Sequence, residues 1–415
     1  MGAPALTDPT LAASLWRAWL EGPRRPERMA FDLIDRGQER VGERSRVPPR
    51  LAPAPDVSRL HPFAQLRSWT PASETDRAIP ILVIAPMSGA FGHIVRDMAS
   101  AFREVGPVHV LEWINARHVA ASNGGFTVDD QVEVIAQALR RVEPKPHMVA
   151  LCQSGPATLR AAALQAGRGA DRAPCSLTLI AAPMDVSAAH TPLSARLSGG
   201  FGFAALGMAE AAMVWRRTVY GDRRRVLPAE AQVSTLAALL AARDPDHDEL
   251  SRLMLEAAGE MRRASGEAGR STFIHLATAF MDLPAEFVLD NMRVIYRGAA
   301  LSAWRGVPIN LRWLAQTPIL TIEGGRDTVT APGQTRAALA MAPGVAARRA
   351  FLAPELGHFG LFLGRGFQRR VYPELRRFWS QVSDTAPQPG ANADASGAPD
   401  RAEIGADALE AALDR

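Results

Sequence analysis

The chain has 415 residues, of which 47% are hydrophobic and 22% are charged, so a globular protein with a sizeable core is expected. Its formal net charge is +4, and Lys145 is the single lysine among many arginines. No clustered basic stripe accompanies this small excess, which argues against nucleic-acid binding. No apolar run reaches the length of a membrane span.

Two further properties of the sequence bear on where the protein works. The only cysteines are Cys152 and Cys175, which are too few for a disulfide framework and suit a reducing compartment. The first residues lack a basic region followed by an unbroken apolar stretch, so no secretory signal is expected. We therefore predict a cytoplasmic protein.

Residues 1–59 are expected to lie outside the main domain. Asp8-Pro9 is typical of a helix start. Five apolar side chains then fall on one side of a helix over residues 8–22, namely Leu11, Leu15, Trp16, Trp19 and Leu20. Such a helix either binds an apolar surface or packs on its own domain or a sister subunit, and the sequence leaves both open. Residues 23–55, rich in Arg and Pro, are typical of an extended arm.

From residue 60 onward, patterns of buried strands alternate with patterns of helices. The expected strands are residues 78–85, 108–113, 147–151, 176–181, 319–323 and 347–352. The expected helices are residues 92–105, 127–142, 157–166, 333–342 and 369–382, the second of them capped by Thr127 with Asp130. Repeated strand–helix units predict an α/β fold, in which a mostly parallel sheet carries helices on both faces.

Two segments depart from this alternation. Residues 187–311 show few strand candidates and several helix patterns rich in Ala, Met and Arg, which predicts a helical lid inserted into an α/β domain spanning residues 60–383. The expected lid helices are residues 229–242, 247–264 and 287–298. Residues 384–415 consist mainly of Ala, Gly, Pro and Asp, a composition that predicts a disordered tail.

The most informative stretch is Ala150-Leu151-Cys152-Gln153-Ser154, where a short buried strand runs directly into a helix. A strand, a sharp turn and a helix, with small residues two positions before and after a nucleophile, are typical of the nucleophile elbow of α/β hydrolases. Cys152 occupies the nucleophile position. Ser154 is the poorer candidate, because the residue two positions after it is Pro156 rather than a small residue.

An acid and a histidine follow Cys152 in the order that this fold requires, which is nucleophile, acid, histidine. Asp327 follows the strand 319–323, and His358 follows the strand 347–352. Both lie beyond the carboxyl ends of strands, where open α/β sheets place their sites. Asp185 also follows a strand and is the rival acid, although we expect it to cap the first turn of the lid.

These residues predict nucleophilic catalysis on an ester. Cys152 would attack, His358 would protonate the leaving alkoxide and activate the second nucleophile, and Asp327 would fix the imidazole tautomer. The oxyanion would accept hydrogen bonds from the backbone N–H of Gln153 and from one in the turn 86–89, either Met87 or Ser88. No metal-ligand spacing and no convincing dinucleotide loop is present, so we expect no metal or bound cofactor.

Several ordered motifs resemble the intracellular polyhydroxybutyrate (PHB) depolymerases, which use cysteine as nucleophile on an α/β-hydrolase fold. The resemblance covers about residues 60–382. It rests on the segments Val83–Gly89, Trp113–Arg117, Cys152-Gln153, Glu323–Asp327 with Gly333–Arg336, and Gly357–Arg365 with Val371–Glu374. The chain departs from the family pattern at Asn115, where members carry Asp, and at Ser154-Gly155, where members often carry Pro.

The resemblance implies a depolymerase that cleaves ester bonds of stored poly(3-hydroxybutyrate) at granule surfaces through an acyl-cysteine, with residues 8–22 as a candidate granule contact. Water would release a 3-hydroxyacid, or a thiol such as coenzyme A would accept the acyl group. Three alternatives stay open at this point: a polyhydroxyalkanoate synthase-like acyltransferase, a general carboxylester hydrolase, and a non-catalytic granule-associated protein. An oligomer is compatible with each.

Overall fold

The computed structural model describes residues 55–72, 79–87, 95–191, 209–229, 231–232, 281–296, 303–345 and 347–385. The predicted helix over residues 8–22 and most of the predicted tail lie outside these residues. Within them, no helix is both long and apolar enough to cross a membrane.

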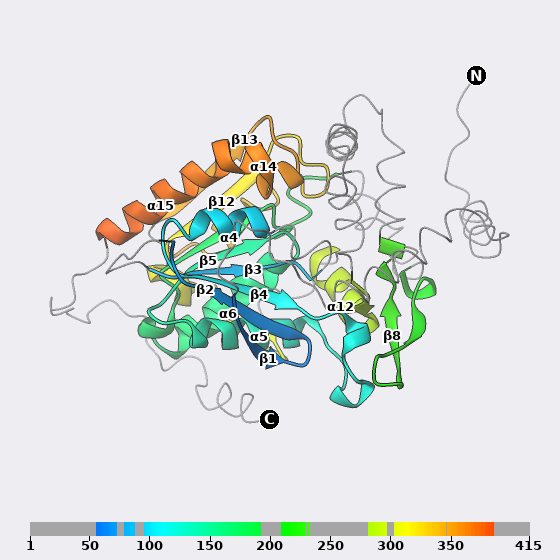
Figure 1. Ribbon diagram of the computed structural model, residues 1–415. Helices are drawn as coiled ribbons and strands as arrows, with labels where there is room; N and C mark the ends of the chain where they lie inside the picture. The colour runs from blue at the N-terminus through cyan, green and yellow to red at the C-terminus, as the bar shows by residue number, and fades with distance from the viewer. Residues whose placement is uncertain are drawn as a thin grey trace, which may run out of the picture. The chain divides into compact units, whose positions relative to one another are not determined.

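An eight-stranded sheet forms the centre of the domain (Figure 1), with the order β1-β2-β4-β3-β5-β6-β12-β13. Its strands are β1 (Asp56–His61), β2 (Ala64–Trp69), β3 (Ile81–Ile84), β4 (Val108–Trp113), β5 (His147–Leu151), β6 (Ser176–Ile180), β12 (Ile319–Gly324) and β13 (Arg348–Ala353). β2 runs antiparallel to both β1 and β4, and every other neighbouring pair is parallel. This is the α/β-hydrolase fold.

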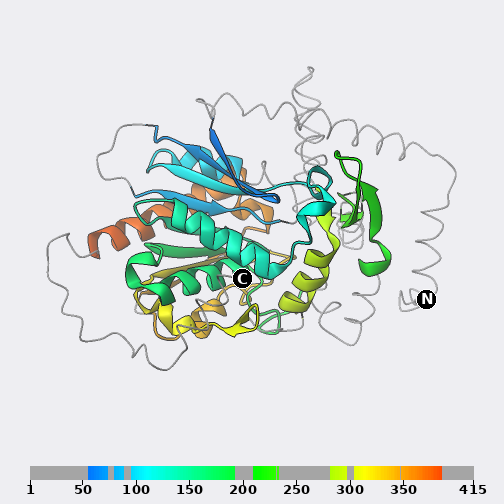
Figure 2. The same cartoon turned by 90° about the horizontal axis from the view of Figure 1, so that it is seen from below.

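Helices cover both faces of the sheet, as the two views show (Figures 1 and 2). One face carries α5 (Val128–Arg141) and α6 (Ser154–Arg168), and the other carries α4 (Arg96–Phe102) and α15 (Tyr372–Thr385). Burial of apolar side chains holds the layers together: Phe102 of α4 meets Trp379 of α15 edge-on at 5.0 Å between ring centroids. β3, β5 and β6 are buried along their whole length, as expected of central parallel strands.

The capping pair predicted for α5 is confirmed. The Thr127 hydroxyl accepts a hydrogen bond from the Asp130 backbone N–H at 3.3 Å, and the Asp130 carboxylate accepts one from the Thr127 N–H at 2.8 Å. Two of the N–H groups that a helix start leaves without an intrahelical acceptor are thereby satisfied.

The predicted start of the domain at residue 60 is wrong by several residues, because β1 begins at Asp56. This strand forms the edge of the sheet, and its residues are exposed or half-buried. Its sequence is therefore polar and carries no buried-strand pattern. The helix predicted over residues 333–342 is also shorter than expected: α13 spans Ala338–Met341, and Gly333 has a φ of +104° that no helix accommodates.

The lid is not purely helical. Inside the segment 187–311, β7 (Val214–Arg217), β8 (Arg223–Leu227) and β9 (Leu283–Pro284) form a three-stranded antiparallel sheet. α12 (Ala285–Tyr296) follows it directly and matches one predicted lid helix. The two other predicted lid helices lie almost entirely outside the described residues.

The sequence does not predict β8 because this strand contains a buried arginine, Arg224. The side chain of Arg224 is largely buried, and its guanidinium donates to the backbone carbonyls of Ala120 at 2.6 Å and Gly124 at 2.7 Å. It also lies over the Phe63 ring, 4.9 Å from the centroid. Arginine at a core-facing position makes the strand look solvent-exposed in sequence, although these contacts satisfy its charge.

Candidate active site

Cys152 sits on a strained turn between β5 and α6. Its φ is +50°, which costs a residue with a Cβ about 1–2 kcal/mol. Backbone hydrogen bonds hold the turn: the Cys152 N–H donates to the Ile180 carbonyl at 2.9 Å, and the Gly155 N–H donates to the Cys152 carbonyl at 3.0 Å. The thiol is half-buried and free of any disulfide. This geometry is that of a nucleophile elbow.

Gly155 explains how the elbow fits against the neighbouring strand. A Cβ at this position would lie 2.4 Å from the Cβ of Ala182, which follows β6. The glycine therefore allows the start of α6 to approach the backbone after β6. The sequence pattern indicates that small residues are needed at Ala150 and Ser154. It does not reveal that a small residue is also needed at Gly155.

Ser154 has a structural role rather than that of a nucleophile. Its side chain is fully buried, and its hydroxyl lies 3.0 Å from the Ile84 carbonyl and 2.8 Å from the Leu151 carbonyl. The same oxygen accepts a hydrogen bond from the Leu151 N–H at 3.1 Å. Both capacities of the hydroxyl are thus used to tie the elbow to β3 and β5.

His358 and Asp327 come together at the carboxyl ends of β12 and β13. The distance between His358 Nδ1 and Asp327 Oδ2 is 2.8 Å, and both side chains are largely buried. The other carboxylate oxygen, Oδ1, accepts the backbone N–H groups of Val329 and Thr330, each at 2.8 Å. The carboxylate is therefore fixed on both sides and can orient only one nitrogen of the ring.

The far side of the imidazole interacts with Cys152. Burial alone would lower the pKa of His358, but the negative charges and hydrogen bonds of Asp327 and Cys152 raise that pKa well above its usual value. Since Nδ1 is bonded to Asp327, the contact with sulfur involves Nε2. The structure thus aligns a thiol, an imidazole and a carboxylate from three separate segments of the chain.

Two glycines permit the approach of the loops that carry the acid and the histidine. A Cβ at Gly324 would lie 2.4 Å from the Leu356 carbonyl oxygen, and one at Gly325 would lie 2.5 Å from the Pro354 carbonyl oxygen. Both neighbours belong to the loop that leads from β13 to His358. The pair Gly324-Gly325 is required by backbone contact rather than by turn conformation.

The rival acid, Asp185, is engaged elsewhere. Its Oδ1 atom accepts hydrogen bonds from the backbone N–H of Ser187 at 2.8 Å and from the Ser187 hydroxyl at 2.6 Å. The carboxylate therefore caps a turn after β6, whereas the sequence predicts that it caps the start of a lid helix. The hydrogen bond to His358 is made by Asp327.

The expected oxyanion donors have different surroundings. Within the described residues, the Gln153 backbone N–H has no hydrogen-bond acceptor, so it is available to a ligand. The Met87 N–H, in contrast, donates to the side-chain oxygen of Gln153 at 3.1 Å. Ser88 lies outside the described residues. A role of these donors in catalysis stays a prediction.

Sequence analysis missed the contribution of the lid helix α12. Its residue Asn291 accepts a hydrogen bond from Gln153 Nε2 at 2.9 Å, directly beside the elbow. Burial, together with the negative charge of Cys152, raises the pKa of Tyr296 at the end of the same helix. The sequence predicts a lid helix over residues 287–298 but gives no register that would bring these two side chains to the elbow.

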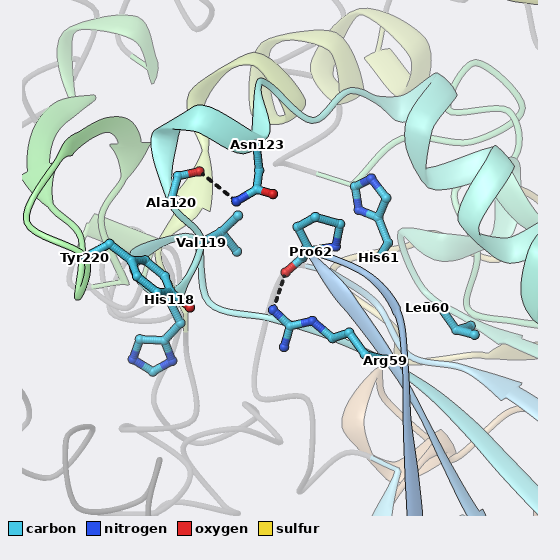
Figure 3. A pocket seen from close by; sticks show the side chains of 9 residues that line it. All are labelled: Arg59, Leu60, His61, Pro62, His118, Val119, Ala120, Asn123 and Tyr220. Carbon is cyan, nitrogen blue, oxygen red and sulfur yellow. Dashed lines mark hydrogen bonds between the residues drawn. The ribbon is translucent and has the colours of Figure 1, made fainter. Parts of the chain in front are cut away.

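A separate pocket of about 370 Å³ lies at the edge of the sheet (Figure 3). Its walls are the end of β1 with the following turn, the loop 118–123 and Tyr220 from the β7–β8 hairpin. None of Cys152, Asp327 and His358 lines it. This pocket is therefore distinct from the aligned thiol, imidazole and carboxylate.

Part of the chain matches a known protein family. Residues 205–383 match the family model described as "PHB de-polymerase C-terminus". This match supports the PHB depolymerase family for residues 205–383. The match supports an ester hydrolase. The matched range contains Asp327 and His358, whereas Cys152 lies before it.

Several solved structures show a low similarity to the chain. A carboxylesterase of Nitrososphaera gargenis shares 14% identity over 78% of this chain and 97% of its own (TM-score 0.47). A bacterial membrane phospholipase A shares 14% identity over 90% of this chain and 98% of its own (TM-score 0.45), and an alpha/beta hydrolase fold protein of Nakamurella multipartita shares 17% over 77% and 95% (TM-score 0.39). Likenesses this low carry no argument about the site. No curated protein matches the chain.

Proposed function

We propose that this protein cleaves the ester bonds of poly(3-hydroxybutyrate) with Cys152 as nucleophile, His358 as general base and acid, and Asp327 as the residue that orients the histidine. The observation that carries the proposal is the alignment at His358, with Asp327 Oδ2 at 2.8 Å from Nδ1 and Cys152 on the other side of the ring. The match of residues 205–383 to the PHB depolymerase model supports the choice of polymer.

The proposed reaction has two half-reactions. The Cys152 sulfur forms a bond to the ester carbonyl carbon, and the thiol proton passes to His358 Nε2. The C–O bond of the ester then breaks, and the alkoxide leaves with that proton as a hydroxyl-ended chain. Water attacks the resulting thioester, gives its proton to His358, and releases the shortened acid while the sulfur recovers a proton.

The electrostatics of the site favour this sequence. The raised pKa of His358 means that the site stabilises the charged imidazolium. This is the form that pairs with a thiolate and that protonates the leaving alkoxide. The buried Asp327 carboxylate stabilises the same charge. Both cysteines are free, and a mechanism with a thiol nucleophile requires this of Cys152. We propose that the reaction takes place in a reducing cytoplasm, at the granule surface.

The test is incubation of the protein with native amorphous granules, followed by analysis of the soluble products. Release of 3-hydroxybutyrate and short oligomers, abolished by Cys152→Ala, is expected. Hydrolysis of short esters with intact granules would instead indicate a general esterase. Incorporation of a hydroxybutyryl thioester into polymer would indicate an acyltransferase, and granule binding without any turnover a coat protein.

Two finer parts of the proposal have their own readouts. Added coenzyme A leaves the products unchanged if water is the acyl acceptor, whereas formation of an acyl-coenzyme A would show that a thiol competes. Deletion of residues 1–22 is expected to reduce cosedimentation with granules while leaving the hydrolysis of short esters intact. Unchanged cosedimentation would assign that segment to packing.

A further inference from the structure

The side chain of Gln153, the residue directly after Cys152, has every hydrogen-bonding position filled. Its Oε1 accepts from the Met87 backbone N–H at 3.1 Å and from Gln131 Nε2 at 3.4 Å. Its Nε2 donates to Gln131 Oε1 at 3.1 Å and to Asn291 Oδ1 at 2.9 Å. A carboxamide offers two donors and two acceptor sites, and all four are used here.

The orientation of this carboxamide is fixed by the backbone. The Met87 N–H can only donate, so the oxygen of Gln153 must face it and the NH₂ group must face away. Gln153 and Gln131 are both buried, and Gln131 is completely so. Water is therefore not expected to replace the partners Met87 and Gln131 when the side chain of Gln153 is changed.

The partners come from three elements that meet at Gln153. Met87 lies in the turn that leaves β3, Gln131 lies on α5, and Asn291 lies on the lid helix α12. The backbone N–H of Gln153, meanwhile, is one of the two donors proposed for the oxyanion. One residue thus supplies a donor with its backbone and holds the turn after β3 with its side chain.

We propose that Gln153 is a positioning residue, whose side chain sets the separation between the nucleophile elbow and the turn after β3, the gap in which the ester carbonyl oxygen must sit. The inference rests on the proposed function of Cys152. Loss of the side chain would leave the thiolate and His358 intact but would let the two sides of the gap move apart. Stabilisation of the developing oxyanion would then be lost.

The test separates the reactivity of the thiolate from the stabilisation of the oxyanion. Iodoacetamide alkylates a thiolate without forming an oxyanion, whereas p-nitrophenyl butyrate acylates Cys152 through one. For Gln153→Met, which keeps the backbone N–H but no longer holds it at its distance from the turn, we expect acylation, measured as the burst of p-nitrophenolate, to slow by up to about 100-fold, the effect of losing one oxyanion donor. Alkylation of Cys152 is expected to proceed at the wild-type rate. Gln137→Leu on α5, whose amide meets only the surface residue Glu133, is the matched control and should behave as wild type.

Methionine is chosen because its flexible, unbranched side chain can fill the same space without an acceptor. If Gln153→Met does not fold, as judged by thermal unfolding, Gln131→Met removes two of the four bonds and keeps the one to Met87. The same split between acylation and alkylation, smaller in size, is then expected. Acylation at the wild-type rate, or an equal loss of both reactions, would overturn the inference. A wild-type protein that no ester acylates would instead refute the proposed function.

Discussion

Replacement of Asp327 by Asn tests the alignment of the site without changing its shape. In the wild type, Oδ1 accepts the N–H groups of Val329 and Thr330, and Oδ2 faces His358 Nδ1. The Asn oxygen must stay with the two N–H donors, so its NH₂ group faces Nδ1. Nδ1 then has to accept a hydrogen bond, and the ring proton moves to Nε2, on the side of Cys152. A ring protonated there cannot accept the thiol proton.

The expected loss is large because the wrong tautomer removes the base entirely. In a serine–histidine–aspartate enzyme, the same change lowers kcat by about 10⁴. A factor of 10⁴ in kcat/KM corresponds to about 5.5 kcal/mol of lost transition-state stabilisation. We therefore expect Asp327→Asn to lower kcat/KM for p-nitrophenyl butyrate at neutral pH by about this factor, with little change in thermal unfolding.

The matched control for this variant is Asp185→Asn. Its carboxylate caps a turn through Ser187, so its replacement should leave kcat/KM close to that of the wild type. The reasoning fails if Asp327→Asn keeps a tenth or more of the wild-type activity, or if Asp185→Asn is the more damaging change.

Three other outcomes are expected. Iodoacetamide should label Cys152 before Cys175, because burial raises the pKa of the Cys175 thiol and leaves little thiolate at neutral pH; mass spectrometry showing faster labelling at Cys175 would contradict this. Burial lowers the pKa of His147 to about 4, so the unfolded state binds the extra proton as the pH falls from about 6.5 to 4, and about 3 kcal/mol of stability is lost over that window. His147→Gln should remove this loss in urea unfolding at several pH values, and an unchanged acid limb would show that other groups cause it. Gly325→Ala should lower both stability and activity, since its Cβ would meet the Pro354 carbonyl, and a fully active variant of wild-type stability would show that the loop yields freely.

The strands of the sheet were predictable because they are buried runs between turn residues. β4 and β5 have the bounds that the sequence predicts, and the Thr127–Asp130 capping box lies where expected. The order of Cys152, Asp327 and His358 along the chain was sufficient to predict that they converge. Each of these features follows from local pattern plus the rule that parallel strands end at one edge.

The parts that sequence reasoning missed depend on contacts between distant residues. Arg224 is buried in the lid sheet because carbonyls about a hundred residues earlier accept its hydrogen bonds. The contact of Asn291 with Gln153 joins positions 138 residues apart. Neither partner carries a periodic signal, since a single polar residue on a helix or strand is ordinarily solvent-exposed. Only the three-dimensional arrangement distinguishes these residues from the other polar ones.

The contacts of Arg224 bear on how the lid sheet is attached to the rest of the domain. Its guanidinium anchors β8 to the carbonyls of Ala120 and Gly124 and to the face of Phe63. Displacement of this strand would remove these contacts of a largely buried cation together, so the strand and the loop that carries Ala120 and Gly124 are expected to keep their relative position.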